Sequence, residues 1–525
     1  MAKPVARWWP LAALLLGAAA LRLGTLDVQS FWYDEAFTPV HVLHASLGAT
    51  LRAVVHHENT PPLWYVLIWG WSRMFGTGEV ALRLPSALAG VATVAVAWGI
   101  GSELAGRSSI GRRTSIVTAA LVAVNPLLVW YSQEARAYGL FVFLASLAMW
   151  CWLRADADPT PGRLTAFAAS GAAALATHYF AVFLVAPMCV WLLRRRERWR
   201  VTVPAVAAIG AVGLALIPLA LAQGGHGTQW IGAWALAARV EAIPQYYLTG
   251  YSGSPLGHGV ELAVALVILV GMGYGLWRAL TPQESDAALL ALGLAACGVL
   301  IPAGMAVAGA DYLAPRNVVA AMVPLSAGIA VIVTARRTGQ AGIALAGAIA
   351  LAFLALSVDV NLSPRLQRGD WRGLAQAIRA EPAPPAAGSP PAARTGALSG
   401  GERAVTAAGA ISRGVRGGGP GGLRGGARVI TTVELGSAPL EYYLPPLHNL
   451  PRGASVRVSE IDETGYPPLL PGAGEPPAPG FHLVEYKNVN GLILYRFRSA
   501  APRTVSEAAL REHVITEARP EVLVP

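Results

Sequence analysis

Long apolar runs separated by short polar segments dominate roughly the first 360 residues of this 525-residue chain. A helix needs about 20 mostly apolar residues to cross a bilayer, and the runs approach that length. They predict about eleven spanning helices, near residues 8–24, 80–104, 115–131, 138–153, 164–177, 179–193, 201–222, 259–278, 286–308, 316–335 and 339–358. We therefore expect a polytopic α-helical membrane protein whose transmembrane module covers residues 1–358.

Two apolar stretches allow another interpretation. Residues 8–24 follow Lys3 and Arg7, as in a signal peptide, but no clear small-x-small cleavage site precedes the next polar segment. We therefore expect an uncleaved first helix. Residues 61–76 are shorter than a span and rich in Trp and Tyr, which favours a helix lying in the membrane interface within the first outer loop.

The positions of the basic residues indicate which predicted loops face the cytoplasm. Cytoplasmic loops carry an excess of Lys and Arg, and alternate loops of this chain are basic when the N-terminus is cytoplasmic. The basic positions under this count are Lys3, Arg7, Arg107, Arg112, Arg113, Arg154, Arg163, Arg194, Arg195, Arg196, Arg198, Arg200, Arg278, Arg336 and Arg337. The pattern predicts a multi-pass protein of the cytoplasmic membrane with an extracytoplasmic C-terminal part.

The C-terminal third changes character after the last apolar run. Residues 359–380 form a connecting segment that includes an amphipathic helix, and the Pro- and Gly-rich residues 381–427 are typical of a disordered linker. Residues 428–435 and 481–499 alternate in polarity and predict strands. We expect a small extracytoplasmic α/β domain over 428–500 and a flexible tail over 501–525.

Composition narrows the function classes. The chain is 54% hydrophobic and 13% charged, and its net charge of +10 sits in short clusters between apolar runs. That distribution gives no stripe for nucleic acid. The three cysteines lie inside apolar runs, where they act as small hydrophobes, so no disulfide or metal framework is implied.

The candidate chemistry collects in the predicted outer loops. The first is "FWYDEAFT", residues 31–38, where Asp34 and Glu35 stand among four aromatic side chains. The others are "HHENTPPLWY" (56–65), "YSQEARAYGL" (131–140), "THYF" (177–180) and "DYLAPRN" (311–317). The cytoplasmic loops are short and merely basic, so any chemistry converges on the outer membrane surface.

Each candidate also has a purely structural interpretation. The two carboxylates could be solvated loop residues, and His56 and His57 could be interfacial surface residues. Glu134 could pair with Arg136 or cap a helix. Likewise, His178 could be a structural histidine at a helix junction, and Arg316 an interface anchor.

Taken in order, the five motifs resemble the membrane glycosyltransferases of the C-type superfamily. The most similar branch is the bacterial dolichyl-phosphate-mannose-protein mannosyltransferase-like proteins, while lipid A aminoarabinose transferases and protein O-mannosyltransferases are more distant. The resemblance covers roughly residues 8–358. It implies a transferase that takes a sugar from a polyprenyl phosphate on the outer face and passes it to a hydroxyl of a cell-wall glycan, glycolipid or protein.

The resemblance also implies roles for residues of this chain. Asp34 would be the catalytic base, with Glu35 orienting the acceptor or supporting the loop. On chemical grounds apart from the resemblance, cationic side chains would bind the donor phosphate, since a guanidinium fork suits phosphate: Arg136 and Arg316, with His57 in support. The remaining candidates would line the substrate pocket: His56, Glu58, Tyr65, Glu134, Tyr138, His178, Tyr179 and Tyr312.

Two positions depart from the family pattern and weaken the phosphate assignments. Thr60 stands where relatives often have Lys or His before Pro-Pro, and Asp311-Tyr312 replaces an Arg-Tyr pair. A single base with direct attack would invert the anomeric centre, whereas a covalent intermediate would need a second carboxylate as nucleophile. The side chains of adjacent residues point in different directions, so we do not expect Asp34 and Glu35 to share one task. This favours direct attack with inversion.

Other readings stay open. No cofactor is expected to be required; a divalent metal is possible, because the outer carboxylates and histidines are suitable ligand types, but their spacing is no metal motif. A transporter or flippase of a lipid-linked sugar is the alternative function, since such proteins use carboxylates and histidines for proton coupling. The expected partners are the lipid-linked donor, the acceptor and membrane lipids, and no nucleic acid.

Overall fold

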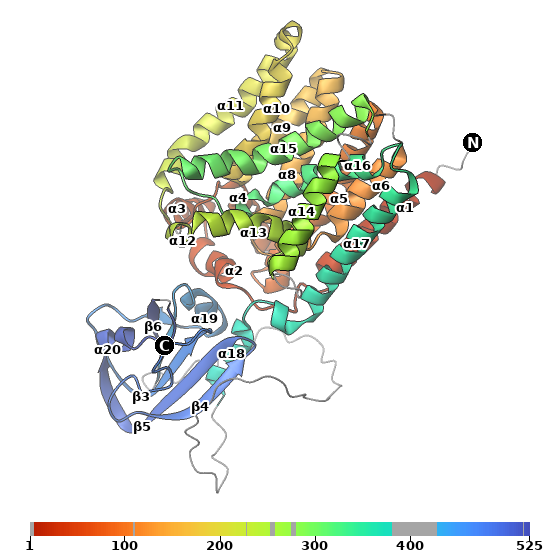
Figure 1. The fold of residues 1–525 in the computed structure, drawn as a ribbon. Helices are drawn as coiled ribbons and strands as arrows, with labels where there is room; N and C mark the ends of the chain where they lie inside the picture. Colours follow the sequence, from red (N-terminus) through yellow and green to blue (C-terminus); the bar gives the residue numbers. More distant parts are fainter. Residues whose placement is uncertain are drawn as a thin grey trace. The chain divides into compact units, whose positions relative to one another are not determined.

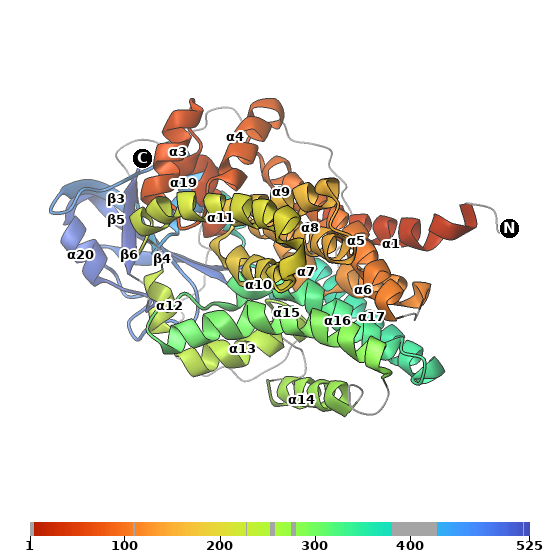
Figure 2. The ribbon, with the colours of Figure 1, turned by 90° about the horizontal axis from the view of Figure 1, so that it is seen from above.

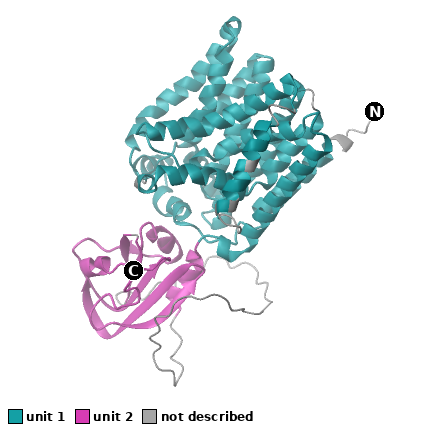
Figure 3. Ribbon diagram, viewed as in Figure 1, with its two compact units in different colours: residues 1–368 teal, residues 369–525 magenta. Residues whose placement is uncertain are grey.

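The computed structural model describes residues 5–108, 111–226, 228–252, 258–274, 280–380, 428–517 and 519–525. The chain forms two compact units, Met1–Arg368 and Gly369–Pro525, which Figure 3 distinguishes by colour. The first unit is helical and the second is built on a sheet. The predicted linker, 381–427, lies outside the described residues.

The first unit has a helix at each of the eleven predicted apolar ranges. These helices are α1 (Val5–Leu23), α5 (Glu79–Ser108), α6 (Arg112–Val124) with α7 (Pro126–Ser132), α8 (Tyr138–Ala157), α9 (Pro161–Thr177), α10 (Val182–Leu193), α11 (Trp199–Ala222), α14 (His258–Tyr274), α15 (Pro282–Val307), α16 (Met322–Val333) and α17 (Gly339–Leu362). Within the described residues, six helical segments are long and apolar enough to cross a membrane, or up to seven if the bent pair α6–α7 is one span. The protein is thus a multi-pass helical protein, and the count of eleven stays a prediction.

Burial differs between these helices. Most of the apolar stretch of α8 and of α16 is buried inside the bundle, whereas α11 and α17 expose most of theirs. Figure 1 shows the bundle from the side, and Figure 2, from above, shows α14 at its rim. The exposed apolar faces, such as Leu214 and Leu221 of α11, are what lipid-facing helices require.

A break divides one apolar run into the two helices α6 and α7. The two helices meet at 58°. Pro126, at the first position of α7, has no N–H to continue α6, and the Asn125 side chain accepts from the Leu128 N–H to start the new helix. Buried Arg22 donates to the Ala123 carbonyl oxygen at 2.7 Å, so the freed end of α6 is satisfied.

Four short elements form the first predicted outer loop: α2 (Tyr33–Phe37), the π-helix η1 (Thr38–Val42), α3 (Leu47–His57) and α4 (Leu63–Phe75). The 13 residues of α4 are too few to span a bilayer. This agrees with the interfacial helix predicted over 61–76, whose depth in a membrane stays a prediction. Further along the chain, α12 (Gln229–Ala233), α13 (Leu236–Thr249) and the 3-10 helices η2 (Tyr179–Ala181), η3 (Arg196–Arg198), η5 (Pro315–Ala321) and η6 (Pro364–Leu366) complete the unit.

Polar clusters mark the two ends of the bundle. Helix α5 carries Arg83 near one end, bound to Glu35, and Arg107 near the other, bound to Asp156 at 3.1 Å. At 1.5 Å per residue these two positions are about 36 Å apart along the helix, slightly more than the ~30 Å hydrocarbon core of a bilayer. Charged side chains therefore gather at the depths where a membrane would end.

The second unit is a six-stranded sheet with the strand order β2-β6-β1-β3-β5-β4. The strands are β1 (Arg428–Val433), β2 (His448–Asn449), β3 (Ser455–Gly465), β4 (His482–Val489), β5 (Leu492–Ser506) and β6 (Pro520–Val524). Strands β1 and β3 run parallel, while the other paired strands run antiparallel. Helices α18 (Trp371–Arg379) and α19 (Ser437–Tyr443) pack on the sheet through a core that includes Trp371, Leu440 and Leu523.

Several predicted boundaries differ from those observed. The predicted flexible tail, 501–525, is wrong: it holds the end of β5, helix α20 (Glu507–Glu512) and β6, which lies between β1 and β2. The apolar run that forms β6 is short, and its partner β1 lies far upstream in the sequence. The local sequence therefore did not indicate that this run forms a strand. The predicted strand region 481–499 is a hairpin, and α18, placed in the connecting segment, belongs to the second unit.

We expect Leu523→Ala to destabilise the second unit by about 2–5 kcal/mol, because it empties a fully buried site in a paired strand. Limited proteolysis and thermal unfolding of the purified full chain measure the loss. The matched change Leu483→Ala, on a side chain that is 43% exposed, should have little effect. Equal stability of the two variants would contradict the placement of β6.

We also expect the two ends of the bundle to face opposite sides of the membrane. In a background with Cys151, Cys189 and Cys297 replaced by Ala, His56→Cys on α3 should react with an impermeant thiol reagent in intact cells. Glu197→Cys in η3 should react only after permeabilisation, because both positions are exposed but lie near opposite clusters. Labelling of Glu197→Cys alone would reverse the predicted topology.

Candidate functional site

Glu35 is the buried anchor of the first loop. Its two carboxylate oxygens accept from Arg83 Nε and Nη2, both at 2.7 Å, and the two side chains are 1% and 3% exposed. The Ala135 N–H donates to the same carboxylate at 2.8 Å, and the Trp32 N–H at 3.1 Å closes a capping box at the start of α2. These contacts hold Glu35 within the loop, and its predicted role in the site stays a prediction.

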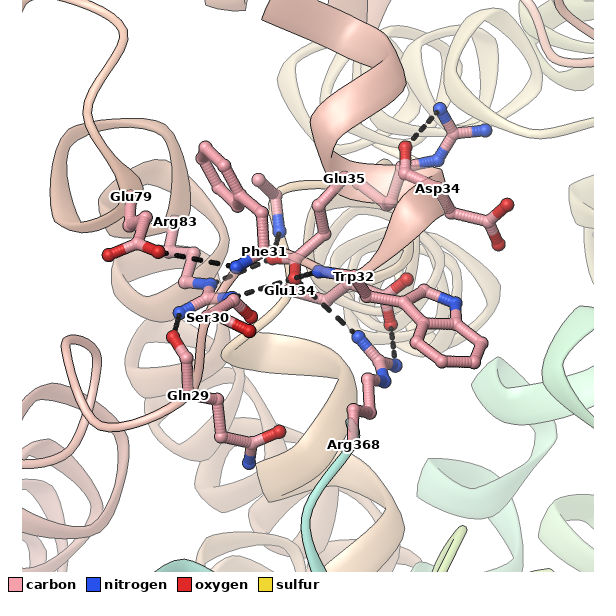
Figure 4. A network of polar contacts seen from close by, with 12 residues as sticks. Gln29, Ser30, Phe31, Trp32, Asp34, Glu35, Glu79, Arg83, Glu134 and Arg368 are labelled. Carbon is pink, nitrogen blue, oxygen red and sulfur yellow. Dashed lines mark hydrogen bonds and ion pairs between the residues drawn. The ribbon is translucent and has the colours of Figure 1, made fainter. Parts of the chain in front are cut away.

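Arg83 also organises the residues before α2. Its guanidinium donates to three backbone carbonyls of the incoming segment, and it lies over the Phe31 ring at 5.3 Å. Figure 4 shows the segment wrapped around this side chain. The carbonyls belong to Leu26, Gln29 and Ser30. A buried guanidinium with every donor group used holds the loop in one position.

Asp34 points away from Glu35, as Figure 4 shows and as adjacent positions require. Its Oδ2 accepts from Arg316 Nη1 at 2.9 Å. Here the exposure is larger, 20% for Asp34 and 26% for Arg316. Burial alone would raise the pKa of Asp34, but neighbouring guanidinium groups, first Arg316 and then Arg136, hold it below its usual value. Asp34 is therefore ionised at neutral pH.

Arg136, predicted to bind phosphate, is already committed. Its two terminal nitrogens donate to the two oxygens of Glu58, each at 2.9 Å, and Nη1 also reaches the Asp34 carbonyl oxygen at 3.3 Å. Glu58 is buried, and Tyr65 lies beside it with its hydroxyl 3.1 Å from Thr60 Oγ1. The structure thus brings Glu58 and Tyr65 to the site, but it assigns Arg136 to a carboxylate.

Glu134 pairs with an arginine that the sequence patterns did not reveal. Arg368, the last residue of the first unit, donates from Nη2 to Glu134 at 2.9 Å, and its Nη1 lies 3.7 Å from Glu35. The guanidinium sits over the rings of Trp130 at 4.7 Å and Trp32 at 5.4 Å. Burial raises the pKa of Glu134 above its usual value despite Arg368. Figure 4 shows Arg368 between the two glutamates.

Four carboxylates of the site therefore each have their own arginine. The pairs are Glu35–Arg83, Glu58–Arg136, Glu134–Arg368 and Asp34–Arg316. In the first three, the carboxylate is at most 4% exposed and the arginine at most 13%. Only Asp34–Arg316 is open enough to exchange partners with a ligand.

A cavity of about 470 Å³ adjoins this open pair. Its walls are mostly apolar and come from α9, α10, α11 and α15, and include Leu175, Phe183, Leu216, Ile217 and Met305. Its polar lining includes Tyr138, His178, Tyr179, Tyr312 and Arg316. Arg316 also lies 4.7 Å above the Trp230 ring, which fixes the guanidinium at the cavity wall. The arrangement suits a ligand with a long apolar part and an anionic head.

His178 lines the same cavity as a neutral side chain. Burial, and after it the charge of Arg316, lowers its pKa to about 3. Its Nδ1 accepts from the Phe180 N–H at 3.2 Å, which places the ring proton on Nε2, and the ring stacks on Phe141 at 4.5 Å. His178 can therefore donate a hydrogen bond but adds no charge. The hydroxyl of Tyr179, by contrast, already donates to Gln223 at 2.7 Å.

The two histidines of the second motif lie apart from this cluster. Both are exposed on α3, where their rings contact each other, and His57 also contacts Phe37. Within the described parts of the chain neither forms a hydrogen bond or an ion pair, so the structure gives no support to His57 as a phosphate ligand or to His56 in the pocket. Both side chains lie on the exposed face of α3. The sequence of this short helix did not show which of its faces would be exposed.

The structure shows what Asp311 does at one of the two positions that depart from the family pattern. Asp311, in place of a family arginine, accepts from both terminal nitrogens of Arg239, at 2.6 and 2.5 Å, and so fixes the loop that leads to Arg316. Among the residues described, no group of three or more His, Cys, Asp or Glu side chains could hold a metal ion. The possible dependence on a divalent metal stays a prediction.

Sequence reasoning missed Arg83 and Arg368. A signal existed for the first, because Arg83 lies inside the predicted span 80–104, and an ionisable residue in a span is a functional candidate. Arg368 follows the last apolar run, where basic residues are common, so its pairing needed the fold.

Comparison with known proteins supports the predicted resemblance. Residues 59–221 match the dolichyl-phosphate-mannose-protein mannosyltransferase family. This confirms the relationship to that group and supports a membrane glycosyltransferase. The matched segment contains Glu134, Arg136 and His178 but not Asp34 or Arg316. No curated protein matches the sequence.

Solved structures offer distant likenesses. The S. cerevisiae protein O-mannosyltransferase Pmt1–Pmt2 complex bound to the sugar donor is 18% identical with a TM-score of 0.33, covering 42% of this chain and 34% of that chain. The archaeal oligosaccharyltransferase AglB from Archaeoglobus fulgidus is 13% identical with a TM-score of 0.44, covering 72% and 58%. ArnT from Cupriavidus metallidurans in the apo state is 15% identical with a TM-score of 0.42, covering 94% and 98%. This chain spans less than two thirds of the first two, and likenesses at these scores carry no functional conclusion.

We expect Arg368 to keep Asp34 ionised, since it is among the cations that lower the pKa of Asp34. Replacing Arg368 with Gln should raise that pKa, so activity should be lost at a higher pH on the acid side of the pH–rate profile. Arg368→Lys should leave this limb near its wild-type position. The Arg368→Gln change would leave the Glu134 carboxylate buried without its partner. The pH–rate profile of the double variant Glu134→Gln/Arg368→Gln is therefore measured as well. An unshifted acid limb in both Gln variants would exclude Arg368 from this role.

Proposed function

We propose that this protein transfers a sugar from a polyprenyl-phosphate donor to a hydroxyl acceptor at the outer face of the cytoplasmic membrane, with Asp34 as general base. One observation supports the proposal: the partly exposed Asp34–Arg316 pair adjoins a mostly apolar cavity, which Arg316 lines. A base and a phosphate-binding cation are then neighbours. The family match over 59–221 supports the same reaction class.

The cavity suits the donor in two respects. Its apolar walls, formed by helices of the bundle, can take the first isoprene units of the carrier. At its polar end, Arg316 uses Nη1 for Asp34, and its other N–H groups have no partner among the described residues. A guanidinium fork binds phosphate through two parallel hydrogen bonds, and the neutral His178 adds a donor that need not be deprotonated.

Donor binding also prepares the base. In the free protein Arg316 lowers the pKa of Asp34, which makes the carboxylate a weak proton acceptor. A phosphate at Arg316 brings negative charge next to Asp34 and competes for the guanidinium, so the pKa of Asp34 rises towards that of a more effective base. Proton abstraction is thus favoured only when the donor is in place.

The transfer then proceeds in one displacement. The acceptor O–H gives its proton to Asp34 as its oxygen bonds to the anomeric carbon. The bond from that carbon to the phosphate oxygen breaks, and the polyprenyl phosphate leaves with the electron pair, stabilised by Arg316. Glu35, with both oxygens held by Arg83 and side-chain exposure of 1%, is unsuited to act as a nucleophile. Direct attack inverts the anomeric centre.

The acceptor stays open between a cell-wall glycan, a glycolipid and a protein. The alternative function, a flippase of the lipid-linked sugar, needs charged groups that move with the lipid across the membrane. In the described residues three of the four ion pairs near Asp34 are buried and fixed, which favours chemistry at one face over transport. A covalent product formed from labelled donor lipid in vesicles distinguishes the two.

We expect Asp34→Asn to lower the transfer rate by about 10²–10⁴, the usual loss for a general base, while donor lipid still binds. The rate is measured in nanodiscs with a panel of polyprenyl-phosphate sugars, and donor affinity separately. Asp158→Asn, at a carboxylate that is 58% exposed, is the matched control and should be near wild type. Near wild-type turnover of Asp34→Asn would place the base elsewhere.

We expect Arg316→Lys to weaken donor binding nearly as much as Arg316→Ala, because a point charge cannot replace a bidentate fork. Equilibrium binding of a polyprenyl phosphate to each purified variant measures the effect. Arg365→Lys, in η6, provides a matched substitution outside the cavity. Unchanged affinity in both Arg316 variants would remove that residue from the donor site.

A further inference from the structure

A second cavity lies at the other end of the helix bundle. It has a volume of about 560 Å³ and is formed by the C-terminal ends of α5 and α10 and the first turns of α15. Arg107 and Arg194 lie on its wall. Because Arg107 is about 36 Å from Arg83 along α5, this cavity is separate from the Asp34 site by roughly a bilayer thickness.

The two arginines share a single buried carboxylate. Arg107 donates to Asp156 at 3.1 Å and Arg194 donates to it at 2.9 Å, each through Nη1. Asp156 is 4% exposed, whereas Arg107 and Arg194 are 27% and 33% exposed. One negative charge therefore faces two positive ones. Within the described ranges, Nε and Nη2 of Arg194 have no hydrogen-bond partner, so they remain able to bind an anion.

The rest of the lining provides a carboxylate and an apolar surface. Asp286 is exposed on the same wall, in the second turn of α15. Leu289, one turn further along α15, is 55% exposed, and Trp191 is 37% exposed beneath the Arg194 guanidinium, 3.9 Å from its ring. Two partly exposed guanidinium groups and an exposed carboxylate thus lie near the exposed Leu289 side chain.

We propose that this cavity binds the headgroup of an aminophospholipid, such as phosphatidylethanolamine. Arg194 would hold the phosphate through its Nε and Nη2, since a guanidinium fork matches phosphate geometry, and Arg107, whose Nη2 already donates to the Leu153 carbonyl oxygen at 2.8 Å, would add positive charge beside it. Asp286 would pair with the primary ammonium, and an acyl chain would lie along Leu289. The site is at the depth where a spanning helix meets the headgroups, and basic pockets between helices at this level bind lipid phosphates.

A site that pairs both charges of the headgroup would distinguish between phospholipids. A lipid with a phosphate but no amine would leave Asp286 next to an anion, and a quaternary ammonium would give that carboxylate no N–H to accept. The site should therefore prefer phosphatidylethanolamine to phosphatidylglycerol and phosphatidylcholine. The inference is independent of the sugar-transfer reaction, because none of its residues is part of the Asp34 site.

The test counts the lipids that remain bound to the purified full chain. Protein from nanodiscs of phosphatidylcholine with equal minor amounts of phosphatidylethanolamine and phosphatidylglycerol is transferred to detergent and examined by native mass spectrometry. We expect preferential retention of phosphatidylethanolamine. Arg194→Gln should lower retention of both minor lipids about tenfold, the effect of losing one charge-assisted hydrogen bond. Asp286→Asn should abolish the preference while phosphatidylglycerol is still retained.

Arg196→Gln/Arg200→Gln removes exposed basic charge close to the cavity but outside its lining, and should leave retention unchanged. Asp286 is exposed, so its Asn variant should fold and keeps the test valid even if Arg194→Gln is unstable. Equal retention of phosphatidylcholine, an unchanged preference in Asp286→Asn, or displacement by soluble glycerophosphoethanolamine as readily as by the lipid would each overturn the proposal.

Discussion

The ion pair between Glu35 and Arg83 is the constraint on which the site depends. Both side chains are almost fully buried, and the carboxylate also accepts two backbone N–H groups. Removing one partner of such a pair costs about 3–5 kcal/mol, because a buried charge is left alone. The pair fastens the short helix α2 to the end of α5. Since neighbouring residues point apart, that attachment directs Asp34 towards Arg316 and the cavity.

The four ion pairs differ in how much of each pair is exposed to solvent. Glu58 and Glu134, like Glu35, are held by buried arginines that have little freedom to exchange partners. Asp34 and Arg316 form the pair with the highest exposure of the four, and they also meet the apolar cavity. Under the function we propose, a lipid phosphate in this cavity would compete with Asp34 for Arg316, while the three buried pairs would keep their geometry.

Apolar pattern and motif order predicted much of this arrangement. A helix stands at each predicted apolar range because helices satisfy their own backbone groups in lipid. Asp34, Glu58, Glu134 and Arg316, taken from motifs far apart in the chain, do come together. Which arginine pairs with which carboxylate was not readable: Arg136 was assigned to phosphate but holds Glu58, and Arg368 was not considered. Such pairing depends on how helices pack, which local patterns do not contain. The same holds for β6, whose partner β1 lies about 90 residues upstream.

We propose that Asp34 acts alone, as a base, while Glu35 only supports the loop. The stereochemistry of the product tests it most directly, because a lone base permits direct attack, whereas a covalent intermediate requires a nucleophilic carboxylate. Single-turnover product, formed from a donor of defined anomeric configuration, can be assigned by NMR from the anomeric proton. We expect an inverted anomeric centre in the product. Retention of configuration would contradict it.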